Sequence, residues 1–88
     1  MTLRDEMIET LTLAFRPERL SVADESDLHA GHAGSREGGE THFRVELVAE
    51  AFAGKSRIER HRMVNETLAP AFARGLHALA VKARAPGE

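Results

Sequence analysis

Residues 54–65 constrain the fold most strongly, because they mark the start of an amphipathic helix. Ser56 and Glu59 have the spacing of a capping box, in which the serine oxygen accepts from the N3 amide and the glutamate reaches back to the serine amide. The apolar positions that follow share one helical stripe: Val64, Leu68, Ala71 and Phe72. We expect this helix to lie on an apolar layer, with His61 packed into the same stripe as a structural residue.

The helix should run to about Arg74 and stop at Gly75, a natural C′ residue. Pro70 falls inside it, which predicts either a kink or a break with Pro70 at the first position of a short second helix.

An earlier helix is predicted over residues 2–16. Its apolar positions recur at every fourth residue: Leu3, Met7, Leu11 and Phe15. Thr2 can cap its start, and Pro17 forces it to stop.

Three segments alternate apolar and polar residues as half-buried strands do: 20–24, 42–48 and 77–83. In the second segment Phe43, Val45 and Leu47 should face the core. The opposite face, which begins with His42 and Arg44, should meet solvent or a partner.

The expected order is helix, strand, strand, helix, strand, in a single α+β domain over residues 1–88. The crossover helix allows the last two strands to be parallel, in a three-stranded mixed sheet with helices on one face. Residues 26–41 are expected to form a long flexible loop, and residues 85–88 a frayed tail.

Composition excludes several classes of function. The 88 residues include no cysteine, so a disulfide scaffold and a self-sufficient thiolate metal site are excluded. A net charge of −2 argues against non-specific nucleic-acid binding. We find no membrane span, signal peptide, catalytic triad, P-loop or paired carboxylates, and so predict a cytoplasmic protein that is not an enzyme.

Two groups of residues remain as candidate sites. Among the five histidines, His29 and His32 lie in the glycine-rich loop and are candidate metal ligands. His77 stands at a helix-to-strand junction, where the residues alone favour a partly buried side chain bonded to a backbone carbonyl. The second group is a basic cluster: Lys55, Arg57, Arg60 and Arg62. It is a solvated helix end, a docking surface for an acidic or glutathione-bearing partner, or a DNA contact, and the positive helix dipole favours an anion beside it.

Several segments together resemble the BolA family. The resemblance rests on Asp24-Glu25-Ser26 followed by His29, on Gly39-Glu40-Thr41-His42-Phe43-Arg44-Val45, on Phe52-x-Gly54-Lys55-Ser56, on Arg60-His61-Arg62-x-Val64 and on His77-Ala78-Leu79-Ala80-Val81. They cover nearly the whole chain in order. The resemblance implies a fold similar to class II KH domains, which grip nucleic acid through a Gly-x-x-Gly loop. Arg57 stands where the second glycine would be.

The resemblance also implies a function. Members of the BolA family pair with monothiol glutaredoxins as heterodimers and share a [2Fe–2S] cluster with them and glutathione, in cluster assembly, cluster transfer or iron regulation. The ligands would be His77 and His29, with His32 as the alternate for the second. From the resemblance we expect that the protein alone is a monomer and holds no tightly bound cofactor. The alternative function is a DNA-binding transcriptional regulator that uses the basic cluster.

Overall fold

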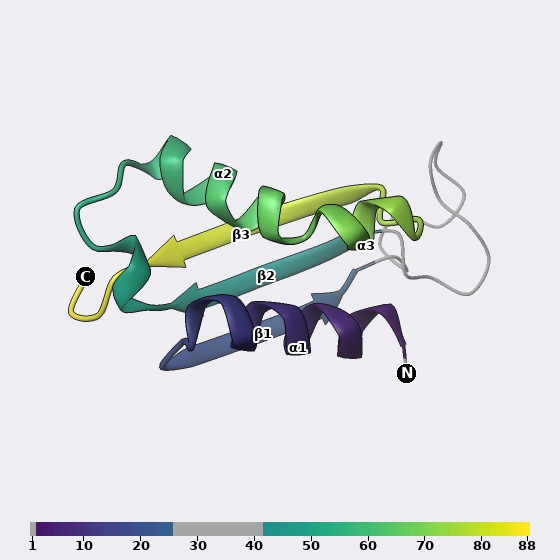
Figure 1. Cartoon of the computed structure of the whole chain (residues 1–88), viewed down its shortest axis with the longest axis horizontal. Coiled ribbons are helices and arrows are strands. Elements are labelled where there is room, and N and C mark those ends of the chain that lie inside the picture. The colour runs from purple at the N-terminus through teal and green to yellow at the C-terminus, as the bar shows by residue number, and fades with distance from the viewer. Residues whose placement is uncertain (1, 26–41) are drawn as a thin grey trace.

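The computed structural model describes residues 2–25 and 42–88, which form one layer of helices on one layer of sheet (Figure 1). The elements follow in the order α1 (Leu3–Phe15), β1 (Arg19–Asp24), β2 (His42–Val48), the 3₁₀ turn η2 (Glu50–Phe52), α2 (Arg57–Thr67), α3 (Ala69–Ala73) and β3 (Ala78–Arg84). The predicted order and α+β class are confirmed. The predicted loop 26–41 lies outside the described residues.

The sheet is mixed and has β2 at its centre. Strand β1 pairs with β2 antiparallel, with Val22 opposite Val45, and β3 pairs with β2 parallel, with Val81 opposite Val45. The parallel pair confirms the expectation of a crossover through α2 and α3. The topology is compatible with a class II KH-like arrangement.

The core lies between the sheet and the helices, on one face only. Its fully buried side chains come from α1 (Leu3, Met7, Leu11), β2 (Phe43, Val45, Leu47), η2 (Phe52) and α2 with the residue after it (Val64, Leu68). Leu79 and Val81 also point inward but are only partly buried, because β3 is an edge strand. The alternating pattern therefore predicted the core residues of β2 correctly: Phe43, Val45 and Leu47.

Local sequence signals set the helix ends. Thr2 forms a capping box with Asp5, and α1 ends with Arg16 in the left-handed region at φ 46°, directly before Pro17. Pro70 breaks the second helical segment, as one of the two predicted outcomes: α2 ends at Thr67, and α3 carries the proline in its first turn. Gly75 has φ 115°, which suits the stop predicted there.

Two expectations for this part of the chain are wrong. Phe72 does not join the buried stripe; it is 38% exposed on α3, because the break before Pro70 changes the helical phase. Residues 85–88 are not frayed, because they form a β-turn in which the Glu88 amide donates to the Ala85 carbonyl at 3.2 Å. Gly87 at φ 86° follows Pro86 in this turn, the pattern of a type II turn.

No helix within the described ranges combines the length and the apolar character that crossing a membrane requires.

Candidate functional site

The predicted site residues that the structure describes lie at two ends of strand β3. His77 immediately precedes this strand, and three residues of the basic cluster, Lys55, Arg57 and Arg60, lie near its last residues. A strand rises about 3.3 Å per residue, so the five residues from His77 to Lys82 separate the two places by roughly 16 Å.

The first place is a pair of histidines. The parallel register sets His42, the first residue of β2, opposite Ala78, so that His77 comes beside it. The two imidazole ring centres are 5.5 Å apart and the ring planes are inclined by 53°. His77 is exposed and His42 is only 8% exposed. One ring of the pair is therefore open to a partner molecule, and the other is enclosed by the fold.

The burial of His42 differs from the expectation that it faces solvent or a partner. It starts the central strand and has a neighbour on either side: Glu25 donates its amide to the His42 carbonyl at 2.7 Å, and His77 lies across from it. Alternation along a strand predicts which face a side chain takes. Whether that face is covered depends on neighbouring segments, which alternation cannot report.

The donor chemistry of the pair suits iron, because imidazole nitrogen is a ligand for transition metals, including the iron of some [2Fe–2S] centres. Within residues 2–25 and 42–88, no group of three or more His, Cys, Asp or Glu side chains is placed to hold a metal ion. The other predicted ligands, His29 and its alternate His32, lie outside the described residues. The chain enters and leaves that segment at Glu25 and His42, beside His77.

The second place is a groove of about 600 Å³ between the start of α2 and the end of β3, which we call the basic groove. Six of its lining residues are lysine or arginine, and the rest are small, apolar or histidine: Arg44, Lys55, Arg57, Arg60, His61, Val81, Lys82, Ala83 and Arg84. The amino-terminal end of α2 adds its positive partial charge to this wall. The charge of this lining would favour an anionic group over a neutral or cationic one.

Local structure at the start of α2 sets one wall of the basic groove. The predicted capping box is present: Ser56 Oγ accepts from the Glu59 amide at 3.1 Å, and Glu59 Oε1 accepts from the Ser56 amide at 3.4 Å. Gly54 has φ 74°, a conformation that a residue with a Cβ rarely adopts, and this allows the turn before the helix. The two features fix the direction in which α2 begins.

Arg60 lines the basic groove, and its side chain is only 13% exposed. Its Nε donates to the Lys55 carbonyl at 2.9 Å, and its Nη1 donates to the Ala83 carbonyl at 3.3 Å. Nη1 and Nη2 also donate to Glu88 Oε1 and Oε2 at 2.5 and 2.8 Å. These hydrogen bonds with Arg60 lower the pKa of the Glu88 carboxyl to about 2, and that carboxylate in turn raises the pKa of Arg60.

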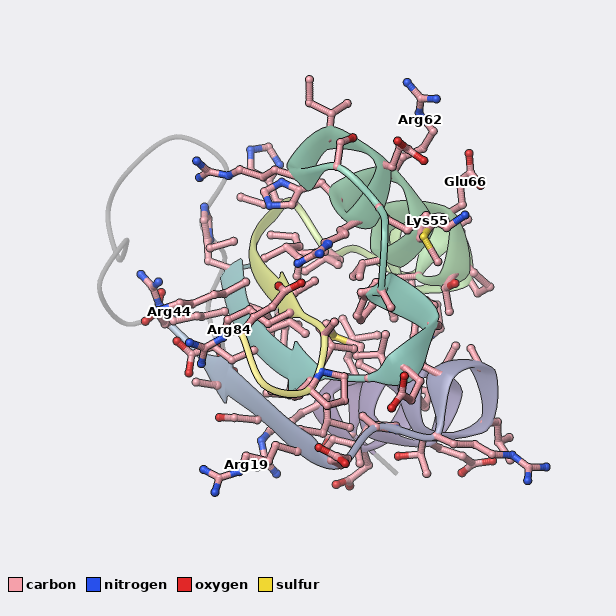
Figure 2. The ribbon with its side chains drawn as sticks, turned by 90° about the vertical axis from the view of Figure 1, so that its left-hand side faces the viewer. Arg19, Arg44, Lys55, Arg62, Glu66 and Arg84 are labelled. Atoms are coloured by element: carbon pink, nitrogen blue, oxygen red, sulfur yellow. The ribbon has the colours of Figure 1, made fainter. Side chains whose placement is uncertain are left out.

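The basic groove includes three of the four predicted basic residues. Lys55, Arg57 and Arg60 line it, whereas Arg62 does not. Figure 2 shows Arg62 projecting from α2 with Glu66, away from Arg44 and Arg84. Arg62 therefore lies outside the groove, and its part in a partner or nucleic-acid surface stays a prediction.

Sequence reasoning missed three groove residues that come from the sheet: Arg44, Lys82 and Arg84. The signal was present, since these positions alternate with the inward Val45, Val81 and Ala83. Finding the groove also required the parallel register of β2 and β3, which places Arg44 opposite Ala80. Glu46 is opposite Lys82 in the same register but does not line the groove.

His61 was expected to be packed in the apolar stripe. Val64 and Leu68 are buried, but His61 is only partly buried and lines the basic groove. Its place one turn before Val64 accounts for this position, at the point where the stripe leaves the core and meets the groove.

Known proteins resemble this chain in both sequence and fold. A protein of Sinorhizobium described as an uncharacterized protein in the cobS 5′ region is 51% identical over 89 residues, covering all of this chain and 96% of that protein. The DNA-binding transcriptional regulator BolA of Vibrio cholerae is 44% identical over 79 residues, covering 90% of this chain and 71% of that protein.

A solved structure, the BolA domain of SufE1 from Arabidopsis thaliana, superposes with a TM-score of 0.88 at 38% identity. The match covers 98% of this chain and 94% of that one. The family model for BolA-like protein matches residues 11–88, which include both the histidine pair and the basic groove. This chain therefore belongs to the BolA-like protein family.

Proposed function

We propose that this protein is an iron–sulfur adaptor that binds a monothiol glutaredoxin and contributes histidine ligands to a bridging [2Fe–2S] cluster. The observation that carries the proposal is the exposed His77 ring, 5.5 Å from the enclosed His42 ring, at the end of the sheet where the segment bearing His29 begins and ends. Membership of the BolA-like family supports it.

In this proposal each residue has a defined part. His77 would bind iron through an imidazole nitrogen, and His29, or its alternate His32, would supply the second nitrogen. His42 would limit the positions open to the His77 ring, because the two rings are neighbours. The glutaredoxin cysteine and the glutathione thiol would hold the other iron. Bound in this way, the cluster would have a higher reduction potential than an all-thiolate one, since histidine replaces thiolate.

The test mixes the protein with a cluster-loaded monothiol glutaredoxin and glutathione and records visible absorption and circular dichroism. The wild-type protein should convert the spectrum of the glutaredoxin homodimer into a different one. His77→Ala should leave the homodimer spectrum unchanged, while His61→Ala, a histidine change in the basic groove, should behave as wild type. A spectrum that His77→Ala converts as fully as wild type would exclude His77 as a ligand.

The second ligand is decided by the same mixture. His29→Ala should abolish the converted spectrum if His29 is the ligand, and His32→Ala should then retain it. The reverse result would assign the alternate. If both variants still give the converted spectrum, neither His29 nor His32 is the second ligand. His42 is then the next nitrogen donor to test.

Nucleic-acid binding is the second candidate function. Two observations favour it: the basic groove with its six lysine and arginine residues, and the relatives that are named DNA-binding transcriptional regulators. Binding of duplex DNA should weaken steeply as salt rises, because phosphate neutralisation releases counterions. Charge reversal at Arg57 and Arg60 should abolish it, and Arg62→Glu, outside the groove, should reduce it much less. An equal loss in all three variants would indicate only a non-specific effect of net charge.

A further inference from the structure

Two arginines that line the basic groove already bind carboxylates of this chain. Glu88 binds Arg60 through both carboxylate oxygens, and Glu25 binds Arg44 at 3.0 Å, although neither glutamate lines the groove itself. We propose that the basic groove docks an acidic peptide segment of a partner protein, and that Glu88 holds Arg60 until that segment displaces it. This inference goes beyond the iron–sulfur role, because it concerns the other end of β3 and needs no metal.

The geometry around Arg60 favours such an exchange. Its Nε and Nη1 also donate to the Lys55 and Ala83 carbonyls, and these two bonds would hold the guanidinium in position when Glu88 leaves. An arginine fixed in this way loses little side-chain entropy when it binds a second carboxylate. The Glu88 side chain is 43% exposed and covers Arg60 from the solvent side. Its departure would open a prepared carboxylate site.

The turn that carries Glu88 is small and nearly self-contained. Besides its two bonds to Arg60, Glu88 is held within the turn: its amide donates to the Ala85 carbonyl at 3.2 Å, and the Ala85 amide donates to Glu88 Oε1 at 3.3 Å. Ala85 is buried, which anchors the start of the turn, whereas Gly87 and Glu88 are exposed. Glu88 can therefore leave Arg60 without moving strand β3.

The lining of the basic groove favours carboxylates over single-stranded nucleic acid. Proteins that bind single strands use aromatic side chains as stacking platforms for bases. This chain has no tryptophan or tyrosine, and none of its four phenylalanines lines the groove. What lines it instead are guanidinium forks, which match the planar carboxylate, together with the small apolar residues Val81 and Ala83. A peptide with acidic side chains on a narrow backbone fits this surface.

The test titrates acetylated, amidated hexaglutamate into ¹⁵N-labelled protein at low ionic strength and follows the Arg60 Nε–Hε signal. Wild type, Glu88→Gln and Glu66→Gln are compared, the last being a matched charge removal on α2 outside the groove. Removing an internal competitor raises apparent affinity by the inverse of the fraction of protein that is free of it. An exposed ion pair of ordinary strength leaves roughly a sixth to a half of the protein free, so Glu88→Gln should bind roughly two- to sixfold tighter. Glu66→Gln should bind as wild type.

Additional arms of the test keep the proposal open to refutation. The double variant Arg60→Gln, Glu88→Gln should lose the gain in affinity for hexaglutamate. Glu88→Asp should show an intermediate gain, because its shorter side chain reaches Arg60 less well. Equal affinity in wild type and Glu88→Gln, or an equal gain in Glu66→Gln, would overturn the displacement. Tighter binding of heptathymidine, an oligonucleotide of matched charge, would overturn the peptide and assign the groove to nucleic acid.

Discussion

Replacing Phe52 by alanine tests whether the segment before α2 is anchored in the core. Phe52 closes the turn η2 and is fully buried, with its ring centre 5.0 Å from that of Phe15 on α1. Truncating a buried phenylalanine typically costs about 3–5 kcal/mol, because the lost contacts leave a cavity. Roughly 0.5–1.5 kcal/mol of this would come from the ring pair with Phe15.

The matched control is Phe72→Ala, the same change at a ring that is 38% exposed. Its loss should be about 1 kcal/mol, since a partly exposed site leaves no closed cavity. A chain of 88 residues has a total stability of about 4–13 kcal/mol. Phe52→Ala should therefore remove a large fraction of the stability, and Phe72→Ala a small one.

The assay is urea denaturation followed by far-ultraviolet circular dichroism, because the chain has no tryptophan or tyrosine to give a fluorescence signal. The free energies of unfolding of the two variants should differ by at least about 2 kcal/mol, with similar dependence on urea. Equal losses would refute the reasoning, because the two rings would then be equally buried, as the helical stripe in the sequence suggested for Phe72.

Three further predictions follow from local features. Ser56→Ala should lower the free energy of unfolding by about 1 kcal/mol through loss of the capping bond to Glu59, whereas Ser56→Asp should retain most of it; an unchanged urea midpoint in Ser56→Ala would contradict a role for the cap. The pKa of Glu88, followed by carboxyl ¹³C NMR, should be about 2 in place of 4.5, and it should return toward 4.5 in Arg60→Gln. Because this pKa is lowered, the stabilising effect of the pair is fully present above pH 4.5 and is lost as the pH falls through about 2, so wild type and Glu88→Gln should differ in stability at neutral pH and converge in acid. Gly54→Ala should cost about 1 kcal/mol in thermal unfolding, since a Cβ there meets nothing within 4 Å but the backbone has φ 74°; Gly54→Asn should recover part of the loss, and equal stability of all three proteins would refute the strain.

Most of the fold could be predicted from the sequence, because its signals are local. The period of two over residues 42–48 gave the bounds of β2, and Pro70 marked the break between α2 and α3. The features that escaped prediction depend on residues far apart in the chain. The bond between Arg60 and Glu88 spans 28 positions and turns a tail expected to be frayed into an ordered turn.

The candidate site was also predictable only where its signals are local in the sequence. The family resemblance implied that His77 is a ligand, which stays a prediction, and only the parallel register shows that His42 is its neighbour. The positive charges of α2 were visible in the sequence as a cluster. A cluster in the sequence does not show that Arg60 lines the groove and that Arg62 does not. Surfaces assembled from a helix and an edge strand require the pairing of strands, which no local period encodes.

The pairing of strand β3 determines when the folding chain forms its two candidate sites. It carries Lys82 and Arg84 of the basic groove, and His77 directly precedes it. Its parallel pairing with β2 closes a loop that includes all of α2 and α3, and pairings of this kind form slowly because the chain entropy is lost before the contacts are gained. During synthesis the residues of β3 also emerge after those of α1, β1, β2, α2 and α3. Chains that have not completed the sheet can therefore present neither the histidine pair nor the basic groove, and partners would bind only fully folded protein.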